Sequence, residues 1–255
     1  MNINIDTDLK NILNFDDGFD YDQAIFRVVP INRLLSLLHE GVNVLVHPSK
    51  WEDPFENFFL KSKFNYNGQP LGVDLLANKI YGQCWTLNDV ETDALWRIYS
   101  PQKTGVRIKS TMRSLLSPLI QDNVVDHGHK VYLGKVKYVK EADLEAEMKN
   151  LKIDAVDFNI KNNILTIQSM LVKREVFEHE NEVRIIYRSD ENLTKGLYRY
   201  RIVPQKFILE LLFDPRMEKN LYDVFEHHLK VILPGCPISQ STLYRSPDFN
   251  VNITG

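Results

Sequence analysis

Short apolar segments typical of β-strands and longer segments typical of helices follow one another in irregular order along this chain of 255 residues. This order constrains the fold most, because regular alternation of strands and helices would predict a parallel, doubly wound sheet. The sequence contains no internal repeat and no low-complexity linker. We therefore expect an acidic, weakly structured lead-in over residues 1–20. One compact α+β domain should follow over residues 21–255, with mixed or antiparallel sheets and flanking helices.

The first third of the chain carries the clearest signals. Residues 24–29 predict a short strand that ends at Pro30, and Asn32 can cap a helix that ends at Gly41. The leucines of this helix form one apolar face. Further strands are predicted at 42–46, 81–86, 105–109, 130–140, 182–188, 197–203 and 207–213. Further helices are predicted from residue 89, over 141–174 in one or two pieces, and over 217–230.

Composition excludes several classes of protein. The first 20 residues contain five aspartates and no apolar run, unlike a signal peptide. No segment approaches the roughly 18 apolar residues of a membrane span. Cys84 and Cys236 match no disulfide framework or zinc spacing, which fits a reducing compartment. The net charge of −3 gives no overall nucleic-acid signature. We expect a cytoplasmic protein that does not bind membranes.

Four segments, in this order, resemble the bacterial domain-of-unknown-function 2971 (DUF2971) family. They are residues 25–56, which end in His47-Pro48-Ser49-Lys50-Trp51-Glu52-Asp53-Pro54-Phe55-Glu56; Cys84-Trp85-Thr86; Trp96-Arg97-Ile98-Tyr99 with the strand from Gly105; and residues 173–186. Residues 208–215 resemble the closing segment of the family, with Asp214 in place of a glycine. Arg97-Ile98 replaces the usual histidine of the third segment. Members of the family resemble abortive-infection proteins, which implies a role in phage defence or as a toxin.

The same order of motifs resembles the ADP-ribosyltransferase clan, whose enzymes use NAD as a substrate. Those enzymes carry Arg or His on the first strand, an aromatic-Ser/Thr segment on a middle strand, and a glutamate, often in Glu-x-Glu, on a later strand. The matching positions here are Arg27, Trp85-Thr86 and Glu180-x-Glu182. The resemblance implies an ADP-ribosyltransferase-like fold and NAD binding at Arg27, Trp85, Thr86 and Tyr99.

The proposed chemistry explains these residue types. Breaking the bond between nicotinamide and ribose creates positive charge on the ribose, and a carboxylate, here Glu182, would stabilise that charge. If residues 180–182 are a strand, Glu180 shares a face with Glu182 and could deprotonate the acceptor. Arg27 would hold a phosphate or ribose of NAD. Tyr99 or Trp85 could stack on the nicotinamide.

Structural roles compete with each of these assignments. Arg27 could pair with Asp53 or Glu56, and the aromatic side chains of Trp85 and Tyr99 could belong to the core. Glu180 and Glu182 could form a structural network with the two arginines of the fourth segment, Arg174 and Arg184.

Three functions remain open from the sequence. The first is an ADP-ribosyltransferase effector that modifies a protein or nucleic-acid acceptor and is held by an antitoxin or defence partner. The second is a non-catalytic sensor of a defence system. The third is a metal-dependent nuclease that uses Asp53, Glu56, Glu180 and Glu182. No glycine-rich phosphate-binding loop is present, and the histidine pairs at 127–129 and 227–228 lack further ligands at metal spacing.

Overall fold

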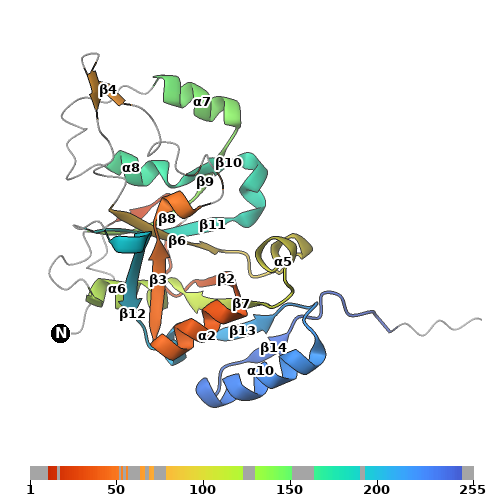
Figure 1. Ribbon diagram of the computed structural model, residues 1–255. Coiled ribbons are helices and arrows are strands. Elements are labelled where there is room, and N and C mark those ends of the chain that lie inside the picture. The colour runs from red at the N-terminus through yellow and green to blue at the C-terminus, as the bar shows by residue number, and fades with distance from the viewer. Residues whose placement is uncertain are drawn as a thin grey trace, which may run out of the picture.

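The computed structural model describes residues 11–15, 18–51, 53, 56, 64–66, 69–71, 79–122, 130–150, 164–189 and 193–248. A large, mostly antiparallel sheet with helices packed around it forms the centre of the molecule (Figure 1), which confirms the predicted α+β class. Helices α7 and α10 lie at opposite ends of the view.

The central sheet has the order β1-β8-β11-β6-β2-β7-β13-β14, with β3 and β12 joined to it through β6. Its strands are β1 Ile12–Leu13, β2 Ala24–Pro30, β3 Val42–Val46, β6 Ile80–Thr86, β7 Gly105–Thr111, β8 Val131–Lys135, β11 Glu182–Arg188, β12 Leu197–Arg201, β13 Glu210–Phe213 and β14 Ile238–Gln240. Among the described pairings of this sheet, β1–β8 and β13–β14 are parallel and the others are antiparallel. Two small sheets pair β9 Lys137–Val139 with β10 Val172–Arg174 and β4 Phe64–Tyr66 with β5 Gln69–Leu71.

The helices are α2 Ile31–Glu40, α5 Asp93–Tyr99, α6 Met112–Asp122, α7 Glu141–Asn150, α8 Ile164–Ser169, α9 Pro204–Phe207 and α10 Lys219–Ile232. Short 3₁₀ helices lie at η1 Pro48–Lys50, η2 Glu175–Glu180 and η3 Thr194–Gly196. Within the described ranges, no helix is both long enough and apolar enough to cross a membrane.

Helix α2 ends where the sequence predicts. Gly41 adopts a left-handed φ of 60° and donates its N–H to the carbonyl of Leu37. The start of α2 differs, because Pro30 is the N-cap residue and Asn32 lies inside the first turn. Proline suits this position, since the missing N–H has no partner at a helix start.

Helix α5 begins later than predicted, at Asp93, after Thr92 accepts a hydrogen bond from the N–H of Leu95. The helix turns Trp96, and not Ile98, toward the core. Trp96 is fully buried and donates its indole N–H to Glu91 at 2.6 Å, whereas Ile98 is 54% exposed. Burying the larger indole removes more apolar area from water.

Other segments also differ from the prediction. The strand expected over 130–140 is interrupted at Val136, whose N–H bonds to the carbonyl of Glu182. The helix expected to reach residue 174 gives way to β10, and residues 151–163 lie outside the described ranges. The strand expected over 207–213 begins later, at Glu210, because residues 204–207 form the short helix α9. Within the expected lead-in, Ile12–Leu13 add β1 to the sheet edge.

Strands β2 and β6 form a single ladder pair, Phe26 with Thr86, whereas β2 pairs with β7 along its whole length. Beyond that pair β2 and β6 diverge. Residues of both strands line a cavity of about 440 Å³. The divergence therefore opens the sheet close to Arg27.

Candidate active site

The predicted motif residues meet on three neighbouring strands. Phe26 of β2 pairs with Thr86 of β6, and Thr86 pairs in turn with Glu182 of β11. Arg27 directly follows Phe26, and Trp85 directly precedes Thr86. Segments separated by more than 150 residues thus lie next to one another on adjacent strands, where β6 ends and β11 begins.

Glu180 does not lie in a strand, contrary to the expectation. It ends the 3₁₀ helix η2, and Asn181 turns the chain with a left-handed φ of 42° before β11 begins at Glu182. The two carboxylates nevertheless approach one cation. Their oxygens lie 2.5 Å (Glu180) and 3.8 Å (Glu182) from Nζ of Lys173.

Lys173 and Arg184 complete a buried cluster of charges with Glu56, Glu180 and Glu182. Arg184 is fully buried and donates to Glu56 at 2.7 Å, to Glu182 at 2.5 Å and to the carbonyl of Met170 at 2.6 Å. Its guanidinium stacks 4.7 Å above the ring of Trp51. The cluster contains three carboxylates and two cations, so one carboxylate charge has no balancing cation within it.

Two hydroxyl groups fix the main chain beneath the carboxylates. Thr86 donates from Oγ1 to the carbonyl of Glu180 at 2.6 Å and accepts from the N–H of Asn88 at 3.1 Å. The hydroxyl of Tyr138 accepts from the N–H of Glu182 at 2.8 Å. These bonds set where the two glutamate side chains leave the backbone.

Tyr99 lies at the last position of α5 and is 41% exposed. Partial burial raises the pKa of its phenol, and the charges of Glu180 and Glu182 raise it further. Burial likewise raises the pKa of Glu180; Lys173 opposes this shift and Glu182 adds to it. Tyr99 therefore faces the carboxylates from outside the cluster.

Arg27 has neither of the ion-pair partners considered from the sequence. Asp53 pairs with Arg174 at 3.1 Å, and Glu56 pairs with Lys173 and Arg184. Across the described ranges, no residue forms an ion pair or hydrogen bond with the Arg27 side chain.

Burial accordingly lowers the pKa of the Arg27 guanidinium. Cys84, Tyr200, Tyr99 and Glu182 are close enough to oppose that shift. Burial, with Glu182 second, raises the pKa of the Cys84 thiol, so this thiol stays protonated. Arg27 therefore lies between the cavity and the carboxylate cluster.

The 440 Å³ cavity next to Arg27 has a positive rim. Arg33, Lys50 and Arg199 also line it, and Arg199 pairs with Glu40 at 2.7 Å. At the floor, Asn43 and Gln83 bond to each other through both amides. These amides are satisfied, so the N–H groups of Arg27 remain for a ligand.

Trp85 lines the same cavity but is 3% exposed. Its indole donates to Gln83 at 2.8 Å and packs edge-on against Phe207. Most of the ring therefore belongs to the core. Tyr99 offers the more accessible of the two predicted aromatic surfaces.

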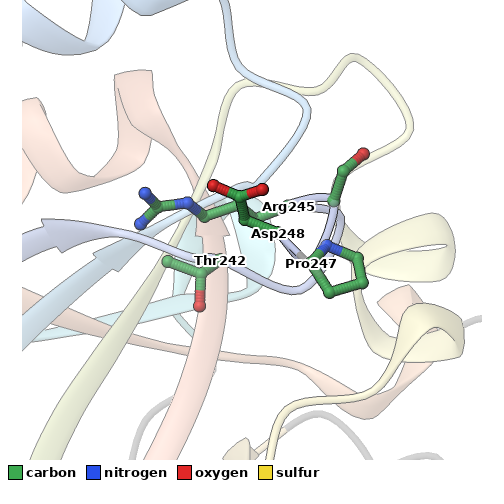
Figure 2. A pocket seen from close by; sticks show the side chains of 5 residues that line it. Thr242, Arg245, Pro247 and Asp248 are labelled. Carbon is green, nitrogen blue, oxygen red and sulfur yellow. The ribbon is translucent and has the colours of Figure 1, made fainter. Parts of the chain in front are cut away.

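A second hollow of about 700 Å³ lies along the C-terminal segment after β14 (Figure 2). It is open and lined by Thr242, Arg245, Ser246, Pro247 and Asp248. These residues come from one stretch of chain, and none belongs to the predicted site.

Arg184 was expected as a possible partner of the glutamates, whereas no role was predicted for Lys173 or Tyr138. Arg184 follows Glu182 by two residues, and alternation along a strand places both on one face of β11. Lys173 belongs to the same motif, yet its contact depends on the pairing of β10 with β9. Arg174, the other arginine considered, bonds to Asp53 and Glu141 instead.

The carboxylates of the nuclease hypothesis are engaged with cations. Glu56, Glu180 and Glu182 accept from Lys173 or Arg184, and Asp53 accepts from Arg174. Across the residues that the structure describes, no group of three or more His, Cys, Asp or Glu side chains is arranged to hold a metal ion.

Comparison with known proteins gives structural neighbours of low sequence identity. DarT from Thermus sp. 2.9 in complex with NAD+ aligns with a TM-score of 0.35 and 11% identity, over 88% of this chain and 98% of that one. The same protein in complex with ADP-ribosylated ssDNA aligns with a TM-score of 0.39 and 12% identity, over 88% and 96%. No curated protein matches the sequence. Residues 95–185, which include Tyr99, Lys173 and both glutamates, match the model of the family described as "Protein of unknown function (DUF2971)", and the resemblance to that family is confirmed over this segment.

Proposed function

We propose that this protein transfers ADP-ribose from NAD to a macromolecular acceptor. The observation that carries the proposal is a separation of charge across neighbouring strands, between the partly buried Arg27 and the carboxylate cluster. Arg27 has no carboxylate partner in the described part of the chain, and the nearby cluster holds one more carboxylate than cations. A ligand with phosphates at one end and developing positive charge at the other would complement both.

The phosphate end of NAD would lie at Arg27. A guanidinium presents a planar fork of donors that matches phosphate oxygens, and a desolvated guanidinium gains most from an anionic ligand. Arg33 and Lys50 add positive charge to the same cavity. The cavity volume of about 440 Å³ lies within the usual range for a small-molecule site.

The nicotinamide ribose would lie between Tyr99 and Glu182. Glu182 accepts hydrogen bonds from Arg184, which fix the position of its carboxylate. A fixed carboxylate stabilises the positive charge of the transition state more than the neutral ribose of the ground state. Tyr99 would stack on the nicotinamide with its exposed face.

Glu180 would act on the acceptor. The bond between ribose C1′ and the nicotinamide nitrogen breaks, and its electron pair leaves with nicotinamide. A new bond forms between C1′ and the acceptor nucleophile, whose proton passes to Glu180. A carboxylate with a raised pKa is a better base for that proton than an ordinary glutamate.

In the cell, the protein would be a toxin or phage-defence effector restrained by an antitoxin or a defence partner. The acceptor would be a protein or a nucleic acid. Such a protein would slow the growth of cells that express it, and Glu182→Gln would relieve the effect.

The experiment combines two assays on purified protein. NAD carrying a labelled adenylate is incubated with lysate protein, RNA or single-stranded DNA, and released nicotinamide is measured in parallel. We expect label transfer that persists in EDTA and is lost in Glu182→Gln. This variant leaves two carboxylates and two cations in the cluster, so it should fold. Arg113→Ala, which removes a surface ion pair with Asp22, is the control and should keep activity.

Three outcomes separate the alternatives. Cleavage of nucleic acid that requires added Mg²⁺ and ignores NAD would replace the transferase with a nuclease. Full activity of Glu182→Gln would remove Glu182 from the reaction. No activity of the folded wild type in either assay, with all three acceptors, would favour a sensor module.

A further inference from the structure

We propose that Lys173 is a positioning residue that holds the carboxylate of Glu180 charged and fixed beside Tyr99. This inference rests on the proposed transfer reaction, in which Glu180 accepts the proton of the acceptor. It assigns a specific task to one of the two cations of the buried cluster.

The geometry around Lys173 is that of an anchoring group. Its side chain is 6% exposed, and Nζ lies 2.5 Å from Glu180, 2.9 Å from Glu56 and 3.8 Å from Glu182. An ammonium group has three donors, which matches three carboxylates around it. The ring of Phe177 lies 4.5 Å from Nζ and covers a further side of the ammonium group.

The division of partners distinguishes Lys173 from Arg184. Arg184 bonds to Glu56 and Glu182, so both carboxylates keep a cation if Lys173 is removed. Glu180 pairs with Lys173 alone among the described residues. Removing Lys173 would therefore leave Glu180 as the unbalanced carboxylate of the cluster.

Four titratable groups from different elements face Glu180. They are Lys173 of β10, Glu182 of β11, Tyr99 of α5 and Tyr138 of β9. Burial raises the pKa of Glu180, Lys173 and Tyr99 lower it, and Glu182 raises it. Since Lys173 is the only cation of this set, its loss must move the pKa further upward.

The consequence for the reaction has a definite sign. A general base must be deprotonated, so the rate falls at acidic pH where Glu180 takes up a proton. A higher pKa shifts this acidic fall to higher pH. An opposite charge at contact distance changes a carboxyl pKa by about 1–3 units, which gives the expected size of the displacement.

The test uses a charge-compensated double variant, because Lys173→Met alone leaves three buried carboxylates with one cation. Lys173→Met/Glu56→Gln removes one charge of each sign and should fold. Lys173→Arg keeps the cation and should restore the wild-type profile. Arg174→Met changes the neighbouring residue, which pairs with Asp53 and Glu141, and is the matched control.

Two measurements are made on each protein. The first is nicotinamide release with acceptor from pH 5 to 9. The second is titration of the glutamate carboxyl carbons by ¹³C NMR, with the Glu180 signal assigned by its absence in Glu180→Gln. In the double variant we expect two changes of at least about one pH unit. The pH below which nicotinamide release falls (the acidic limb of the rate profile) should rise, and so should the midpoint of the Glu180 titration.

The two proposals fail in different ways. An unchanged Glu180 titration in the folded double variant would overturn the role of Lys173, whether or not the protein releases nicotinamide. A shifted titration in a protein that never releases nicotinamide would overturn the transfer reaction and leave the charge-holding contact. A shifted titration with an unmoved acidic limb would show that Glu180 is not the base that Lys173 serves.

Discussion

Thr86 donates a 2.6 Å hydrogen bond from its hydroxyl to the main-chain carbonyl of Glu180, although the two residues are 94 positions apart. The same hydroxyl accepts from the N–H of Asn88, and the side chain of Asn88 donates to the carbonyl of His179. The end of β6 thus fixes the end of η2. This contact links the aromatic-Thr motif to the Glu-x-Glu motif through the backbone.

Replacing Thr86 by valine should remove this link while keeping the shape of the side chain. We expect a loss of about 1 kcal/mol in the free energy of unfolding, typical of one intramolecular hydrogen bond. Nicotinamide release should fall more than tenfold, because Glu180 is no longer fixed. Thr111→Val, which removes the hydroxyl that bonds to Ser114 at the start of α6, should cost similar stability without loss of activity. Equal activity of both variants would contradict a positioning role for Thr86.

The strands of the central sheet were largely predictable from local patterns. Pro30 ends β2, Gly41 ends α2, and Pro48 follows β3. Proline fixes its own φ and lacks an N–H, and glycine tolerates the left-handed φ that ends a helix. The boundaries of β9 and β10 were not predictable. Their pairing places Lys173 in the cluster, and strand pairing between distant segments depends on tertiary contacts.

The candidate site was predictable only in part. The order of motifs named Arg27, Thr86 and Glu182, and β2, β6 and β11 are neighbours in the sheet. Glu180 was expected on the same strand face as Glu182. The left-handed turn at Asn181 instead brings its carboxylate to Lys173 from a 3₁₀ helix. A single residue with positive φ is not encoded in hydrophobic periodicity, so alternation alone could not reveal it.

Replacing Arg27 by methionine should separate stability from function. The guanidinium is partly buried with no carboxylate partner in the described ranges, so its removal should stabilise the fold by about 1–2 kcal/mol. NAD binding should weaken at least tenfold, since the phosphate loses its fixed donors. Thermal unfolding and calorimetric titration with NAD measure both effects. The control is Arg199→Met, which lines the same cavity but pairs with Glu40. A destabilised Arg27→Met protein that still binds NAD would contradict the assignment.

Replacing Arg184 by methionine should damage the fold severely. The side chain is fully buried and bonds to Glu56, Glu182 and the carbonyl of Met170. Its loss would leave buried carboxylates uncompensated, at a cost of about 3–5 kcal/mol. Arg174→Met removes ion pairs with Asp53 and with the more exposed Glu141, and Arg174 itself is 23% exposed, so its loss should cost less. Urea unfolding of the two variants gives the comparison, and similar losses would show that the cluster tolerates the missing cation.

Asp214 should make the stability of the protein depend on acidity. Its buried carboxylate accepts from the N–H and guanidinium of Arg216 at 2.7–3.0 Å, and Arg216 in turn bonds to the carbonyls of Trp96 and Ser100 at the end of α5. Burial alone would raise the pKa of Asp214, but these hydrogen bonds outweigh it and lower the pKa below the usual range.

A carboxyl group with a lowered folded-state pKa stabilises the protein above its unfolded pKa of about 3.9, and that stability is lost as pH falls through the folded value. We therefore expect Asp214→Asn to cost about 1.5–3 kcal/mol at pH 7, the range for hydrogen bonds to a charged group. The difference between wild type and variant in urea unfolding should shrink as the pH falls below about 3.9, because the wild-type carboxyl then takes up a proton as well. Asp223→Asn, at an exposed pair with Lys219, should change stability by less than about 1 kcal/mol at any pH. A constant difference between wild type and Asp214→Asn from pH 7 to pH 2.5 would mean that the charge of Asp214 contributes nothing to holding the end of α5.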